Sequence, residues 1–71
     1  GSAPPLVGTG KANPVAMFLA TAMMLDYLNE TESARRLQQA VNDCILNLDT
    51  TPDLGGSLTT SEVTEKVIQR L

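Results

Sequence analysis

The feature that most constrains this chain is the segment Val15–Leu25, in which Thr21 is the one polar residue. It follows Asn13-Pro14, a pair typical of a helix start, with asparagine as the cap and proline in the first turn. A helix that begins here is apolar on nearly every face, and such a helix has to be buried on all sides. A chain of 71 residues is too short to surround it. The sequence therefore indicates a segment that packs inside a larger core.

The rest of the chain consists of loops rich in glycine or proline and of helices that carry an apolar stripe. Asn29 followed by Glu32, and Thr59 followed by Glu62, have the three-residue spacing of a capping box at a helix start. No strand pattern appears in the sequence, so the chain alone is predicted to be all-α, a loop plus three helices. The predicted segments are a loop at 1–12, helices at 13–28 and 30–48, a loop at 49–58 and a helix at 59–71.

Charge and composition exclude several classes of function. The net charge is -3 and the five basic residues are scattered, so no basic stripe is available for a nucleic acid. The longest apolar run is too short to cross a bilayer, which takes about 20 residues. The absence of histidine removes the Ser-His and Cys-His nucleophile pairs, and the carboxylates lack the spacing of a metal loop. We expect no nucleic-acid partner, no membrane partner, and no catalytic or metal-binding residue in this chain.

The single cysteine, Cys44, cannot form a disulfide within the chain, which favours a reducing compartment. The cytoplasm is the expected location, with the mitochondrial matrix as the alternative. Cys44 lies on the apolar stripe of the second predicted helix, so we expect it to be buried as a small hydrophobic residue. A reactive thiol would need a neighbouring base or cation, and the sequence indicates none.

Two glycine-containing loops each end at a helix start, where free N–H groups and the helix dipole suit polar or anionic ligand groups. Their motifs resemble, in the same order, those of the isocitrate and 3-isopropylmalate dehydrogenases. The first loop resembles that family's Gly-Ser-Ala-Pro…Gly…Ala-Asn-Pro run without a gap, and later motifs resemble its Met-Met-Leu, Asp-Leu-Gly-Gly and Thr-Thr-Ser-Glu. The matching residues are Gly1-Ser2-Ala3-Pro4, Gly8, Ala12-Asn13-Pro14, Met23-Met24-Leu25, Asp53-Leu54-Gly55-Gly56 and Thr59-Thr60-Ser61-Glu62.

The resemblance implies that the chain is the C-terminal part of an NAD-dependent β-decarboxylating dehydrogenase, within the larger domain of an α/β enzyme. Such an enzyme oxidises a 2-hydroxy acid with NAD and decarboxylates it with Mg or Mn. The metal ligands and the catalytic residues of the family have no counterpart in this chain, so the chain alone is expected not to be an enzyme. Its expected partners are the rest of the dehydrogenase chain or another subunit, in a homo-oligomer.

The resemblance also assigns cofactor-binding positions. The backbone of the first three residues would lie near the ribose and phosphates of NAD, and Leu6 would line the adenosine pocket. Asn13 would meet the edge of the adenine, which suits a side chain that both donates and accepts hydrogen bonds. Asp53 would lie beside the adenine. The implied cofactor-binding residues are Gly1, Ser2, Ala3, Leu6, Asn13 and Asp53.

Two departures from the family pattern bear on the cofactor. NAD-specific members place an aspartate for the ribose hydroxyls where this chain has Pro5, whose side chain cannot hydrogen-bond them. NADP-specific members place Lys and Tyr at the positions of Pro5 and Leu6, and Tyr and Arg at those of Pro52 and Gly56. None of the four is present, and no cation is placed for a 2′-phosphate. NAD is therefore favoured over NADP by elimination, while the effect of Pro5 on NAD binding stays open.

Two alternatives come from other classes of protein. A free-standing helical interaction or oligomerisation module derived from the same family would use the apolar helix to bind a partner or a second copy. An acyl carrier protein would use the Leu54–Leu58 segment around Ser57 for phosphopantetheine. That segment lacks one residue of the carrier motif, and too few residues follow it for the remaining helices.

We expect residues 1–71 alone to bind NAD negligibly, because the chain carries only one side of the implied cofactor site. Calorimetric titration of the isolated chain with NAD measures this. Micromolar affinity would contradict the expectation, because it would require a complete site within these residues.

Overall fold

A computed structural model of the chain describes residues 13–71. In this part of the chain the α-helices are α2 (Val15–Tyr27), α3 (Thr31–Leu46) and α4 (Thr60–Gln69), with a 3-10 turn, η1 (Pro52–Leu54), between the last two. No strand occurs among these residues, which confirms the all-α prediction for them. The predicted loop at 1–12 lies outside the described residues.

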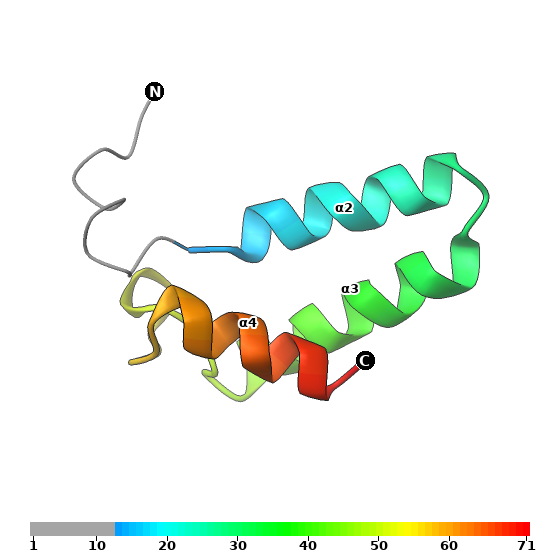
Figure 1. Ribbon diagram of the computed structural model, residues 1–71. Helices are drawn as coiled ribbons and strands as arrows, with labels where there is room; N and C mark the ends of the chain where they lie inside the picture. The colour runs from blue at the N-terminus through cyan, green and yellow to red at the C-terminus, as the bar shows by residue number, and fades with distance from the viewer. Residues whose placement is uncertain (1–12) are drawn as a thin grey trace, which may run out of the picture.

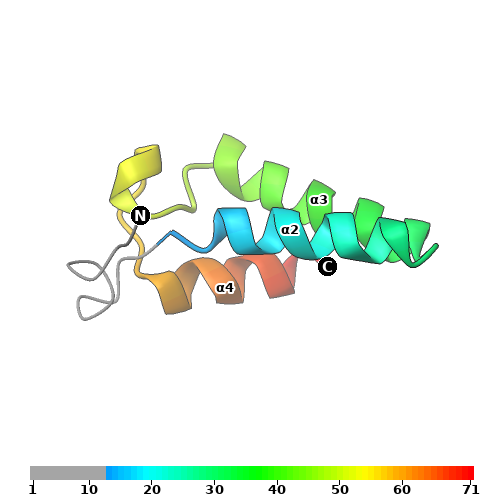
Figure 2. The ribbon, with the colours of Figure 1, turned by 90° about the horizontal axis from the view of Figure 1, so that it is seen from above.

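The three helices form two layers. α2 and α3 run antiparallel as a hairpin, and α4 packs against α3 (Figure 1). Seen from above, α2 lies over the line between α3 and α4 (Figure 2). At 1.5 Å per residue, the 13 residues of α2 and the 16 of α3 span about 20 and 24 Å. The similar lengths bring the start of α2 and the end of α3 to the same end of the molecule.

The core lies where the three helices meet, and it is built from small and β-branched side chains. Val41 and Val63 are completely buried, and each contributes roughly 1.5–3 kcal/mol relative to an exposed side chain. Cys44 is also completely buried, as predicted. The cluster consists of Val15, Ala22, Leu37, Ala40, Val41, Cys44, Val63 and Val67.

The apolar stripes predicted on the second and third helices extend too far at their C-terminal ends. Ile45 and Leu48 are 36% and 57% exposed, and Ile68 and Leu71 are about as exposed as Leu48. Ile45 and Ile68 lie in the last turns of α3 and α4, and Leu48 and Leu71 lie beyond the ends of these helices, so the stripe leaves the helix–helix contact. The predicted bounds 30–48 and 59–71 are accordingly longer than the observed helices.

Two helix ends use residues in the left-handed region. Asn29 has φ 64 and Leu48 has φ 57. In each case the N–H of this residue and the N–H of the next residue donate to carbonyls of the last helical turn, in a Schellman arrangement. Asn29 was predicted to begin the second helix, and this is wrong because its conformation ends α2. Glu32, its expected capping partner, instead pairs with Arg35 and Arg36 one turn further on, at 2.8 and 3.2 Å.

The other two predicted helix starts agree more closely with the structure. The capping box of α4 is confirmed: the Glu62 N–H donates to Thr59 Oγ1 at 3.2 Å, and the Thr59 N–H donates to Glu62 Oε1 at 2.9 Å. At α2 the cap residue is Pro14 rather than Asn13. The side chain of Asn13 still accepts the N–H of Val15, so the predicted capping interaction exists although the helix begins one residue later.

The sequence predicts that α2 has to be buried on all sides, and residues 13–71 do not bury it in this way. Only Val15 and Ala22 of this helix are buried, whereas Met23 and Met24 are 74% and 63% exposed and Tyr27 is 85% exposed. Exposed apolar patches of this kind are typical of surfaces that pack against other protein. None of the helices in the described part is long and apolar enough to span a membrane.

The segment between α3 and α4 is held by two buried threonines. Thr50 and Thr51 have no exposed surface. The Thr51 carbonyl accepts the N–H groups of Leu54 and Gly56, at 3.0 and 3.2 Å, and the Thr50 carbonyl accepts that of Leu58 at 2.9 Å. A β-carbon on Gly56 would lie 2.1 Å from the Thr50 carbonyl oxygen. Only glycine therefore allows this close approach of backbone to backbone.

Gly56→Ala should lower the free energy of unfolding by roughly 1–3 kcal/mol, because the loop backbone has to move to admit the methyl group. Urea unfolding followed by far-UV circular dichroism measures the change. Ser57→Ala, at the exposed neighbouring position, is the matched control and should leave stability within about 0.5 kcal/mol. Equal stability of the two variants would contradict the assigned packing.

Candidate functional site

Two of the residues assigned by resemblance lie together at the end of the molecule where α2 begins. Asn13 Nδ2 donates a hydrogen bond to Asp53 Oδ2 at 2.9 Å, although 40 residues separate them in the sequence. Asn13 directly precedes Pro14 and α2, and Asp53 lies in η1. The contact joins the start of the first described helix to the loop that follows the second. Asn13, Asp53 and the neighbouring Thr51 are here called the Asn13–Asp53 site.

The orientation of the Asn13 amide is fixed by its two partners. Its Oδ1 accepts the N–H of Val15 at 2.9 Å, and its Nδ2 donates to the Asp53 carboxylate. A backbone N–H can only donate, and an ionised carboxylate can only accept, so exchanging the amide oxygen and nitrogen would break both bonds. The amide oxygen is thereby committed to the helix start, and the amide nitrogen points toward Asp53.

Asp53 is in turn held by Thr51. The Thr51 hydroxyl donates to Asp53 Oδ1 at 2.5 Å. This hydrogen bond, with a further contribution from Asn13, lowers the pKa of Asp53 below its ordinary value. The carboxylate is therefore ionised at neutral pH, and it is exposed on the surface while Asn13 is half-buried. The site offers a ligand a fixed negative charge beside an amide N–H.

The remaining assigned residues, Gly1, Ser2, Ala3 and Leu6, lie outside the described residues. Thr51 was not singled out from the sequence, because a threonine in a loop rich in turn-forming residues is ordinary. The available signal was its position two residues before Asp53, a spacing at which a Thr hydroxyl can reach a neighbouring side chain or backbone group.

A second polar cluster joins the end of α4 to α3 and to the segment that follows it. Arg70 donates to Asp49 Oδ2 at 2.8 Å and to Cys44 Sγ at 3.3 Å. The hydrogen bond to Asp49 is the main cause of the raised pKa of Arg70. The expectation that Cys44 has no neighbouring cation is therefore wrong, because the last turn of α4 carries Arg70 back to the end of α3. The thiol is completely buried, so this contact ties two helices together rather than opening a reactive site.

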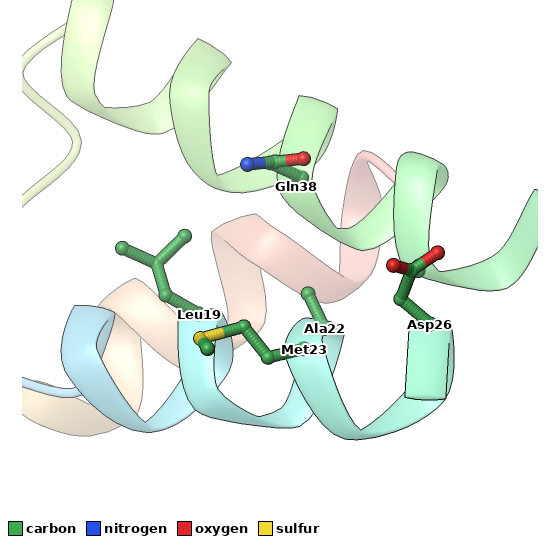
Figure 3. A pocket seen from close by; sticks show the side chains of 6 residues that line it. Leu19, Ala22, Met23, Asp26 and Gln38 are labelled. Atoms are coloured by element: carbon green, nitrogen blue, oxygen red, sulfur yellow. The ribbon is translucent and has the colours of Figure 1, made fainter. Parts of the chain in front are cut away.

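A pocket of about 460 Å³ lies between α2 and α3, away from the Asn13–Asp53 site (Figure 3). Among residues 13–71, Asp26 is the one ionisable side chain that lines it, and Gln38 contributes an amide. A single exposed carboxylate among apolar groups does not make an acid–base pair or a metal site. Its lining residues are Leu19, Ala22, Met23, Asp26, Ala34 and Gln38.

Comparison with known proteins identifies the family. A sequence profile described as isocitrate/isopropylmalate dehydrogenase matches residues 1–67. The whole chain is 51% identical over 71 residues to the isocitrate/homoisocitrate dehydrogenase of Thermus thermophilus, of which it covers 21%. It is 44% identical over 68 residues to the homoisocitrate dehydrogenase of Methanocaldococcus jannaschii, a match that covers 96% of this chain and 20% of that protein.

A mitochondrial protein is a further relative. The chain is 45% identical over 73 residues to subunit 2 of the mitochondrial isocitrate dehydrogenase [NAD] of Kluyveromyces lactis, covering 100% of this chain and 20% of that protein. All three relatives are dehydrogenases by name. The chain belongs to the isocitrate/isopropylmalate dehydrogenase family, which confirms the resemblance seen in its motifs. It spans about a fifth of the length of the curated relatives it matches.

The contact between Asn13 and Asp53 should persist at neutral pH and be lost in acid. Because the pKa of Asp53 is lower in the folded chain than in the unfolded chain, its contribution to stability is present above the ordinary value near 3.8. That contribution is lost as the pH falls through the lower folded pKa. An NMR titration of the Asn13 side-chain amide measures the midpoint. Asp53→Asn should abolish the transition, and a midpoint above the ordinary aspartate range would contradict the assigned hydrogen bonds.

Proposed function

We propose that this chain forms the adenosine side of the NAD site in a dehydrogenase that oxidises and decarboxylates a 2-hydroxy acid. The observation that carries the proposal is the contact between Asn13 and Asp53. The family resemblance assigns both residues to the adenine, and the fold brings them within hydrogen-bonding distance across 40 residues of sequence. Membership of the isocitrate/isopropylmalate dehydrogenase family supplies the reaction class.

The residues of the site fit the adenosine part of NAD. The 6-amino group of adenine is a donor and its ring nitrogens are acceptors, which complements a carboxylate beside an amide N–H. The arginines that could bind a 2′-phosphate are engaged elsewhere: Arg35 and Arg36 pair with Glu32, and Arg70 pairs with Asp49. This supports NAD over NADP. The Kluyveromyces relative carries NAD in its name.

The role of this chain is to bind and orient the cofactor. NAD supplies the hydride acceptor for oxidation of the substrate alcohol. Asn13 and Asp53 would hold the adenine at the start of α2, and the Mg or Mn ion with its ligands would be supplied by the rest of the enzyme. The exposed apolar side chains of α2, among them Met23 and Met24, would pack against that remainder.

The exposed face of α2 also suits the alternative, a helical interaction module derived from the family. Such a module would use Met23, Met24 and Tyr27 to bind a partner or a second copy. It gives no reason for the fixed arrangement of Asn13, Thr51 and Asp53 at the end of the molecule where α2 begins. The NAD-binding role accounts for both features, and we therefore prefer it.

The proposal is tested in a chimaera in which residues 1–71 replace the matching segment of the Thermus relative. Asn13→Ala should raise the KM for NAD by roughly 2- to 12-fold, the equivalent of one hydrogen bond worth about 0.5–1.5 kcal/mol. The kcat should fall less, because the residue contacts the cofactor far from the reacting carbon. Steady-state kinetics with isocitrate as substrate measure both constants.

Two further variants make this result specific. Asn13→Ser keeps a helix-capping oxygen and should raise the KM for NAD as Ala does, while preserving thermal stability. Asn42→Ala, at an exposed asparagine on α3, is the matched control and should leave the KM unchanged. A KM for NAD that stays at the reference value in both Asn13 variants would remove Asn13 from the site.

A further inference from the structure

We propose that Thr51 is a positioning residue through which the site selects a 6-aminopurine over a 6-oxopurine. The inference rests on the proposed function, because it concerns the adenine end of the same cofactor. Thr51 has no exposed surface and would not touch the cofactor. It acts through Asp53: the Thr51 hydroxyl donates to Asp53 Oδ1, and Asp53 Oδ2 accepts a hydrogen bond from the Asn13 amide.

Thr51 provides a fixed point from which to hold Asp53. Its carbonyl accepts two N–H groups of the η1 turn, from Leu54 and Gly56, and its side chain is completely enclosed. The hydroxyl therefore cannot move without disturbing the buried backbone around it. Asp53, by contrast, is exposed on a short turn. Without the hydrogen bond from Thr51, its carboxylate would be free to turn into solvent, and the Asn13 amide would lose its partner.

The hydrogen bonds already made determine what the pair can still offer a ligand. An amide nitrogen carries two hydrogens, and one of those on Asn13 goes to Asp53. The Asn13 oxygen is committed to the Val15 N–H. Each Asp53 oxygen has about two lone-pair sites and accepts one hydrogen bond from a side chain among residues 13–71. What remains is one N–H donor from Asn13 next to acceptor capacity on Asp53.

This order of donor and acceptor matches adenine. Its 6-amino group donates and the adjacent ring nitrogen N1 accepts. Hypoxanthine reverses both, because its 6-oxo group accepts and its N1–H donates. A 6-oxopurine would therefore place its carbonyl oxygen against the Asp53 carboxylate or its N–H against the Asn13 N–H. A polar site rejects such a reversed analogue because its own groups are left unpaired.

The test compares equilibrium binding of NAD and of its hypoxanthine analogue, nicotinamide hypoxanthine dinucleotide, by calorimetry in the absence of substrate. In the chimaera, NAD should bind about tenfold more tightly than the analogue. Thr51→Val should reduce this ratio to about twofold by weakening NAD binding. Thr51→Ser, which keeps the hydroxyl, should restore the ratio. Thr64→Val, at a half-buried threonine on α4, is the matched control and should leave it unchanged.

The variants separate the possible outcomes. Asp53 is exposed, so Asp53→Asn should leave the chain folded. It should also reduce the ratio of the two affinities. It therefore tests the inference even where Thr51→Val does not fold. A ratio that stays at the chimaera's own value in folded Thr51→Val, or in Asp53→Asn, would overturn the role of Thr51. If instead the Kd for NAD is unchanged in Asn13→Ser, the proposed function itself fails, and this result is independent of the ratio in the Thr51 variants.

Discussion

The amide of Asn13 is the interaction on which the rest of this arrangement depends. Its oxygen closes the first turn of α2 through Val15, and its nitrogen reaches Asp53 in the turn after α3. One side chain thus joins two segments that are 40 residues apart. Because each partner accepts only one orientation of the amide, the same contact fixes both the helix start and the polarity of the surface beside it. The Asn13 amide therefore serves both the fold and the candidate function.

That contact is available only because the intervening chain returns to the same place. The antiparallel hairpin of α2 and α3 has two arms of similar length, and the buried valines Val41 and Val63 hold α3 and α4 together. The close approach of Gly56 to Thr50 then folds the connecting loop back on itself. The buried core is small, and its main consequence for function is that it presents the η1 turn to the start of α2.

The sequence predicts the helices because their apolar spacing is strong, and it predicts the capping box at Thr59 because that signal is local. It misplaces the junction at Asn29, since the same residue type favours both a helix start and a left-handed helix end. The pairing of Asn13 with Asp53 has no local signal, because it depends on how the hairpin returns. Thr51 is missed for the same reason: its role exists only once Asp53 is in place.

The large exposed apolar face of α2 and the ordered polar site at its start lie on the same helix, so the packing of one affects the position of the other. A helix whose outward side chains include Met23 and Met24 gains stability only when other protein covers them. Covering that face would hold α2 in place along its length and so fix the position of Asn13 at its first turn. A site that relies on the orientation of one amide benefits from a rigid helix behind it. Packing of α2 and the proposed binding of NAD at its N-terminal end are therefore expected to be coupled, so that a change in the apolar face would alter the affinity for NAD without any contact to the cofactor.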